Sequence, residues 1–243
     1  MGFTSYSESR TTVGALDLSK IMRLVYFWLA MGLLVGFGIA LTLRGAATAA
    51  LESGDPTKFA LFNPGLMLAL GIGYIVVAFA FHPVVMRANV TVGAIMYLGM
   101  TAIFGLFTSV TLTMYTDKAI IAAFAATAGM FGAMSLIGYT TKMDLSKIGS
   151  IAIMALIGIL IASVVNIFLR SEAIYWIVTY AGVLIFAALT AWDTQKIKRN
   201  AAQVAVSGDG TMAQRVALLG AFELFLDFVN LFLYLLRIFG SRD

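Results

Sequence analysis

Polar and ionisable side chains recur on one face of an otherwise apolar stretch in the last part of the sequence. Glu223, Asp227, Asn230, Tyr234 and Arg237 follow one another at intervals of four, three, four and three residues. That spacing places all five on one face of a helix. Carboxylates are hard oxygen ligands that suit calcium, and they also gain and lose protons. The pattern therefore indicates a face that binds or conducts ions or senses pH, with Glu223, Asp227 and Asn230 as candidate pore or ion-binding residues.

A further carboxylate, Asp193, ends a different apolar stretch. A carboxylate near the C-terminus of a helix meets the negative end of the helix dipole, so it should have a cation beside it. Arg87 follows another stretch that ends at the same membrane face, and an Arg87–Asp193 ion pair is therefore expected. The alternative is that Asp193 is an interfacial residue near Lys196 and Lys198.

Asp193 and Asp227 could share a proton and act as a pH sensor, because they are expected on adjacent antiparallel helices. The same two carboxylates are the candidate calcium ligands. Asp227 lies roughly 16 Å into its segment at 1.5 Å per residue, whereas Asp193 lies near the interface. The two can meet only if the helix that carries Asp193 tilts or continues past Lys198.

The composition indicates that these residues lie in membrane-spanning segments. Hydrophobic residues make up 61% of the 243 residues and charged residues only 12%. A membrane-spanning helix needs about 20 apolar residues. Six segments of that length contain no Asp, Glu, Lys or Arg, and a seventh contains Glu223 and Asp227; the seven are 24–43, 59–81, 88–116, 119–141, 148–169, 173–192 and 216–236. We predict an all-α integral membrane protein, with residues 1–20 as a polar cytoplasmic tail and 21–240 as one membrane domain.

The positions of Lys and Arg predict the orientation, because cytoplasmic loops carry an excess of both. With the N-terminus in the cytoplasm, ten of the sixteen Lys and Arg residues lie inside and four outside. The basic character is therefore explained by membrane topology, and nucleic acid is not expected as a partner. Residues 200–211 are predicted to form a cytoplasmic turn.

Small residues recur within several of the segments. Gly32 and Gly36 form a GxxxG pattern, and Gly129, Gly132 and Gly138 punctuate the fourth segment. Such residues let helix backbones approach closely. We expect them to pack the bundle internally, with a homodimer interface as the alternative.

Two motifs carry a resemblance to a known family. The stretches AWDTQKIK (191–198) and LFLDFVNLFLYLLRIFG (224–240) closely resemble the Bax inhibitor-1 family of transmembrane Bax-inhibitor-motif proteins, and 129–146 and 162–173 resemble its bacterial inner-membrane branch. The resemblance covers roughly residues 20 to 240. It implies a seven-helix bundle with a central C-terminal helix in the bacterial inner membrane.

The resemblance also implies an activity, a pH-sensitive calcium leak. The family's sensor is a pair of aspartates in the DTQ and LDF motifs, which are Asp193 and Asp227 here. An arginine six residues before a glycine latches the first aspartate, and Arg87 with Gly93 matches that spacing. Glu223 matches the family's acid one turn before the second aspartate.

Two other functions compete with the channel. A non-transporting regulator would bind other membrane proteins, such as a membrane protease. An intramembrane aspartyl protease would need a GxGD motif at its second aspartate, but Asp227 follows Phe225 and Leu226. With no cysteine and a single histidine, His82, we expect no enzymatic activity and no cofactor.

Overall fold

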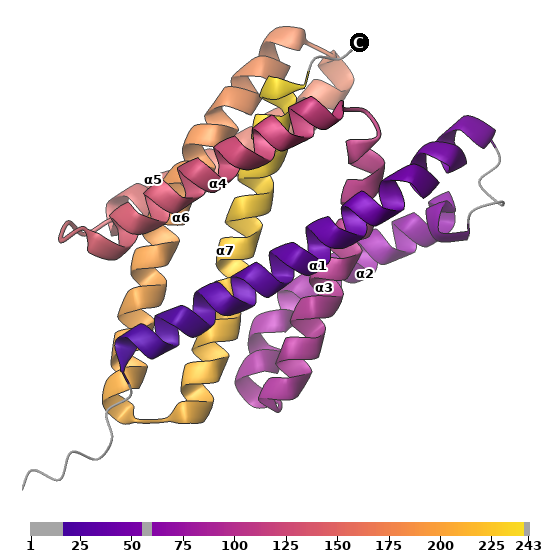
Figure 1. Cartoon of the computed structure of the whole chain (residues 1–243). Coiled ribbons are helices and arrows are strands. Elements are labelled where there is room, and N and C mark those ends of the chain that lie inside the picture. Colours follow the sequence, from indigo (N-terminus) through magenta and orange to yellow (C-terminus); the bar gives the residue numbers. More distant parts are fainter. Residues whose placement is uncertain (1–16, 55–59, 241–243) are drawn as a thin grey trace, which may run out of the picture.

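Seven long helices make up the computed structural model, which describes residues 17–54 and 60–240. They are α1 (Leu18–Ser53), α2 (Pro64–Arg87), α3 (Val90–Leu112), α4 (Asp117–Thr140), α5 (Ser146–Leu169), α6 (Glu172–Ser207) and α7 (Gly210–Phe239), with a short 3₁₀ helix, η1 (Ala60–Phe62), before α2 (Figure 1). No strand occurs in the described ranges. All seven are long and apolar enough to cross a membrane, which confirms the predicted all-α, seven-helix architecture. Most of the predicted polar tail lies outside the described residues.

Helix ends follow from local capping. Asp17, Asn63 and Asn89 each accept a hydrogen bond from the first turn of the helix that follows, which satisfies backbone N–H groups that have no partner within the helix. Gly54 and Gly208 end α1 and α6 with φ of 62° and 69°, a left-handed conformation that suits glycine.

The predicted turn at 200–211 is wrong in extent. Helix α6 continues to Ser207 and α7 begins at Gly210, so only Gly208 and Asp209 separate them. Residues 200–206 are mostly Ala, Val and Gln, which stay helical once the helix leaves the hydrocarbon. The Asp209 side chain then caps α7 by accepting from the backbone N–H of Thr211 and of Met212.

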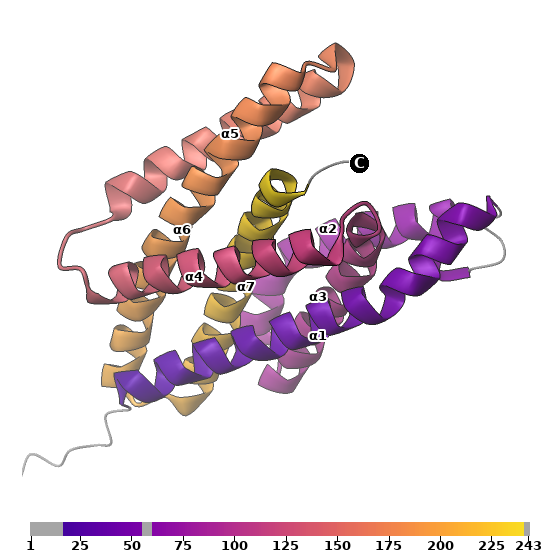
Figure 2. The same cartoon turned by 45° about the horizontal axis from the view of Figure 1, so that its top comes forward.

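Helix α7 occupies the centre of the bundle, as Figures 1 and 2 show. It packs against α1, α2, α3, α4 and α6, and 67% of its apolar window is buried, more than in any other described helix. Phe225 and Phe232 are completely enclosed. The prediction of a central C-terminal helix is confirmed.

Close helix crossings occur at three of the glycines that the sequence singled out. A Cβ added to Gly32 would collide with the Tyr97 side chain, and one added to Gly138 would collide with the Ala191 backbone. At Gly36 it would lie 3.2 Å from a backbone oxygen of α3. Internal packing is therefore confirmed for these three positions.

Gly129 and Gly132 behave differently. A Cβ added to either would meet no atom within 4 Å among the described residues. The expectation that these two glycines pack the bundle internally is wrong, because they lie on a face of α4 that no other helix covers closely.

Candidate functional site

The two sequence-predicted aspartates meet between α6 and α7. Because α6 extends past Lys198, antiparallel packing brings Asp193 beside Asp227, and their carboxyl groups interact directly. Asp193 is 8% exposed and Asp227 is 4% exposed. One carboxyl oxygen of Asp227, Oδ2, is buried and has no hydrogen-bond partner among the described residues. A proton held between the two groups would satisfy it.

Lys196 supplies the positive charge at this site. Its Nζ lies 2.5 Å from Oδ1 of Asp193 and 3.2 Å from Oε2 of Glu223. The ammonium also lies 4.5 Å from the centroid of the Trp192 ring, a distance that suits a cation–π contact. This lysine therefore lies within a group of three carboxyl groups. We call Asp193, Glu223 and Asp227 the carboxylate cluster.

The predicted Arg87–Asp193 ion pair is not formed among the described residues, so that prediction is wrong for this conformation. Arg87 lies in the last turn of α2, which packs against α3 and α7. Lys196, one turn after Asp193 on its own helix, takes the place expected for the arginine. The alternative partner on α6 is therefore the one the structure brings to Asp193.

Residues just after Asp193 attach α6 to α4 and to the loop that follows it. Oγ of Ser135 and Oγ1 of Thr194 lie 3.1 Å apart within the packed interior. The Gln195 side chain accepts from the backbone N–H of Leu145 at 2.9 Å and donates to the carbonyl of Met143 at 2.7 Å. The DTQ segment is thus tied on one side to α7 and on the other to the α4–α5 loop.

An exposed ion pair also joins the α4–α5 loop to α6. Arg199 donates to Oδ1 of Asp144 at 2.7 Å and to Oε1 of Gln195 at 2.7 Å. The hydrogen bonds from Arg199 and Ser146 hold the pKa of Asp144 below its usual value of 3.8. Sequence reasoning missed this pair, although the spacing of Gln195 and Arg199 at i and i+4 indicates that they share a helix face.

The remaining polar residues of α7 continue toward the opposite face of the bundle. Asn230 donates to the carbonyl of Leu226 on its own helix at 2.8 Å, so it does not bond to the carboxylate cluster. The ring of Tyr234 packs over Gly182 of α6. Arg237 lies 5.2 Å from the Tyr234 ring centroid and 5.8 Å from that of Tyr175.

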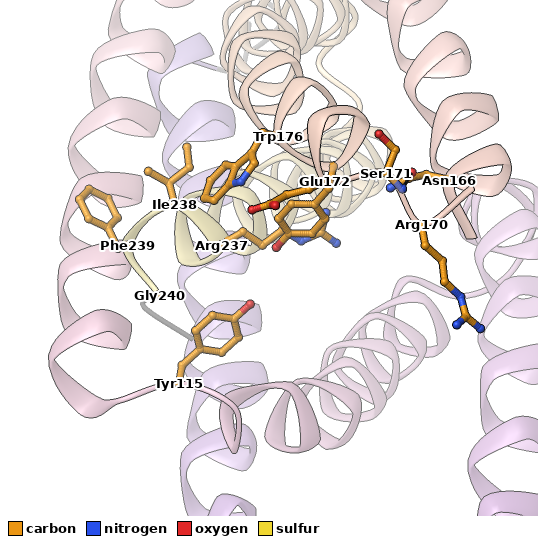
Figure 3. A pocket seen from close by; sticks show the side chains of 11 residues that line it. Tyr115, Asn166, Arg170, Ser171, Glu172, Trp176, Arg237, Ile238, Phe239 and Gly240 are labelled. Atoms are coloured by element: carbon orange, nitrogen blue, oxygen red, sulfur yellow. Dashed lines mark hydrogen bonds between the residues drawn. The ribbon is translucent and has the colours of Figure 1, made fainter. Parts of the chain in front are cut away.

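A cavity of about 680 Å³ receives the last of these side chains (Figure 3). Arg237, Glu172 and Trp176 line it, from α6 and α7, together with Tyr115 from the α3–α4 turn. A second cavity of about 380 Å³ shares Arg237 and Tyr115 with the first. The polar face of α7 therefore runs from the carboxylate cluster to an open cavity at the other end of the bundle.

No group of three or more His, Asp or Glu side chains is arranged to hold a metal ion within residues 17–54 and 60–240. Asp193 and Asp227 lie side by side, and Glu223 forms an ion pair with Lys196. Within that described part, the arrangement therefore forms no cage for a resident metal.

Comparison with known proteins places this sequence in a family. The family model described as inhibitor of apoptosis-promoting Bax1 matches residues 18–243. The chain belongs to the Bax inhibitor-1 family. This confirms the resemblance seen in the two motifs, and the match includes all three carboxyl groups of the cluster.

Bacterial relatives extend over nearly the whole chain. The inner membrane protein YbhL of Escherichia coli K12 is 41% identical over 225 residues, which cover 93% of each chain. An uncharacterized protein of Deinococcus radiodurans is 38% identical and covers 93% of each chain. The uncharacterized protein RP147 of Rickettsia prowazekii is 35% identical, over 93% of this chain and 91% of its own. The chain is therefore a membrane protein of a family with inner-membrane members.

Proposed function

We propose that this protein is a pH-sensitive calcium leak channel of the bacterial inner membrane, gated through Asp193 and Asp227. The observation that carries the proposal is the buried contact between these two carboxyl groups at the start of a polar face that leads to an open cavity. Intramembrane ionisable residues are costly and are usually retained for function.

The chemistry of the cluster supports a response to pH. When Asp193 and Asp227 share a proton, Lys196 offsets one of the two negative charges that remain on the cluster, and α6 stays closed on α7. Loss or gain of a proton changes the repulsion between the two carboxyl groups at very short range. The Ser135–Thr194 contact and the Gln195 hydrogen bonds link any shift of α6 here to α4 and the α4–α5 loop.

Calcium is the transported ion in this proposal. Carboxylate and carbonyl oxygens are its preferred ligands, and the acids of the cluster would bind it briefly during passage. In this proposal Arg87 acts in a second conformation, in which it replaces Lys196 as the cation beside Asp193.

Calcium flux into liposomes that contain the purified protein tests the proposal between pH 6 and pH 8. We expect flux that changes with pH in the wild type, and a flat response in Asp193→Asn and Asp227→Asn. Asp117→Asn is the matched control, because Asp117 pairs with Arg44 away from the cluster and its removal should leave the pH response intact. Unchanged pH responses in both cluster variants would overturn the mechanism.

A non-transporting regulator is the second candidate, and the lipid-facing helices favour it. Only 6% of the apolar window of α2 and 11% of that of α5 is buried, and Gly129 and Gly132 lie on an uncovered face of α4. A partner such as a membrane protease would dock on these surfaces. Absence of flux at every pH, together with a stable membrane-protein partner in a pull-down, would support the regulator over the channel.

A further inference from the structure

Two arginines line a cavity that none of the functional assignments above uses. The cavity has a volume of about 740 Å³ and lies between the α2–α3 turn and the first turns of α7. We call it the two-arginine pocket; its lining side chains with polar groups are Trp28, Arg87, Asn89, Thr91, Thr211, Gln214 and Arg215.

Arg215 is fixed in this pocket with part of its hydrogen-bonding capacity unused. One terminal nitrogen donates to the carbonyl of Ala88 at 3.0 Å, which ties α7 to the end of α2. Its Nε is buried and has no hydrogen-bond partner among the described residues. A buried N–H on a charged group is costly when it has no acceptor, so an acceptor from outside the chain would be stabilised here.

Arg87 adds a second positive charge. It ends α2, is exposed, and forms no ion pair with an acid of the described chain. Among the residues that the structure describes, no Asp or Glu lines the pocket. The first residues of α3 also line it, and the N-terminal end of that 23-residue helix carries a partial positive charge. The two guanidinium groups and the N-terminal end of α3 therefore favour an anion in the pocket, and they outweigh the partial negative charge at the C-terminal end of α2, which also lines it.

We propose that the two-arginine pocket binds a phosphate group. Guanidinium groups match phosphate oxygens in a planar, two-bond geometry, and the hydroxyl of Thr91 and the amide of Gln214 supply further donors. The same chemistry is offered by free phosphate and by an anionic phospholipid headgroup, since the pocket lies at helix ends where headgroups lie. Occupancy would hold Arg87 at α7, away from Asp193. The inference does not depend on calcium transport.

Trp28 provides the readout, because it lines the pocket and the chain contains three tryptophans in all. Trp176→Phe and Trp192→Phe together leave Trp28 as the source of tryptophan emission. The protein is placed in nanodiscs of phosphatidylcholine and titrated with inorganic phosphate, with chloride holding the ionic strength constant. In a second arm, free phosphate is omitted and the fraction of phosphatidylglycerol in the nanodisc is raised stepwise.

We expect a saturable change in Trp28 emission in at least one arm, and the arm that saturates identifies the source of the phosphate group. Arg87→Gln and Arg215→Gln should each raise the half-saturation point by about tenfold or more, because hydrogen bonds to charged groups are strong. Arg170→Gln is the control, an exposed arginine outside the pocket, and should leave the titration unchanged.

Two results would overturn the proposal: no saturation in either arm, or half-saturation points in the arginine variants equal to that of the wild type. Arg215→Gln could unfold the α2–α7 contact, so each variant is checked by its thermal midpoint. Arg87 is exposed and forms no hydrogen bond needed for the fold among the described residues, so Arg87→Gln decides the matter if Arg215→Gln proves unstable.

Discussion

At the scale of single residues, Lys196 holds the carboxylate cluster together. Its ammonium contacts Asp193 and Glu223, and the side chains of Lys196 and Asp193 are 32% and 11% exposed. Removing one member of a largely buried ion pair leaves the other charge without compensation. Loss of the lysine alone should therefore lower the free energy of unfolding more than loss of both members of the pair.

Lys196→Gln should lower the free energy of unfolding by about 1–3 kcal/mol, the cost of leaving a buried hydrogen-bonding group without its partner. Adding Asp193→Asn to the same chain should recover part of that loss, because the uncompensated charge is then also removed. Lys196→Arg keeps the charge and serves as control. Unfolding in sodium dodecyl sulfate measures the wild type, Lys196→Gln, Asp193→Asn, the double variant and Lys196→Arg. Effects of the two single substitutions that simply add in the double variant would contradict the coupling.

Asp144 supplies a pH prediction outside the membrane. Its pKa is lowered by Arg199, so the contact stabilises the folded state above the ordinary aspartate range and is lost as pH falls below 3.8 toward the depressed value. Asp144→Asn should slightly lower the thermal midpoint at pH 7, with the difference shrinking below pH 3.8. The effect is small because both side chains are largely exposed. Lys142→Gln, in the same loop, should show no such pH dependence.

The sequence identified both aspartates but left open whether Arg87 or a lysine of the same helix lies beside Asp193. The spacing of Glu223 and Asp227 on an apolar helix, and the position of Asp193 at the end of another, were enough to predict the acids. Choosing between Arg87 and Lys196 requires knowing which helices pack together. A charge-free window shows that a helix spans the membrane, but it carries no information on its neighbours.

At the scale of helices, the crossing of α4 and α6 depends on Gly138. A Cβ there would collide with the backbone of Ala191, two residues before Asp193. Gly138→Ala should lower the free energy of unfolding by about 1–3 kcal/mol, as overpacking does. Gly129→Ala on the same helix is the matched control and should be neutral or stabilising by up to about 1 kcal/mol, since alanine favours the helix.

Thermal midpoints of the two glycine variants measure this difference. Equal destabilisation by both substitutions would mean that α4 does not approach α6 as closely as described. The sequence shows that α4 carries several small residues. Their spacing alone did not show that Gly138 lies at a helix crossing and Gly129 does not. The two differ only in whether another helix crosses at that point.

Helix length was also only partly predictable. Windows free of charge located six of the seven helices, and a window that contains Glu223 and Asp227 located the seventh. The charge-free windows stop at or before the first charged residue. They therefore missed the last four turns of α6, in which Asp193 and Lys196 lie. Charged residues end a hydrocarbon-spanning window without ending the helix itself.

At the scale of the whole molecule, orientation in the membrane can be tested cleanly because the chain contains no cysteine. Val206→Cys introduces a single thiol near the α6–α7 turn, where Val206 is 84% exposed. Lys118→Cys introduces one near the start of α4. With the N-terminus in the cytoplasm, a membrane-impermeant maleimide should label Lys118→Cys in intact cells, and Val206→Cys only after permeabilisation. The reverse pattern would contradict the predicted orientation.

The 36 residues of α1 have a further consequence for the molecule. At 1.5 Å per residue the helix is about 54 Å long, whereas the hydrocarbon core is about 30 Å thick. Such a helix tilts or protrudes, and its tilt responds to the thickness of the surrounding lipid. Gly36 brings α1 against Phe225 of α7. We therefore expect the acyl-chain length of the lipid to change the tilt of α1, and with it the packing of α1 against α7. The protein should pack differently around α7 in thin and in thick bilayers.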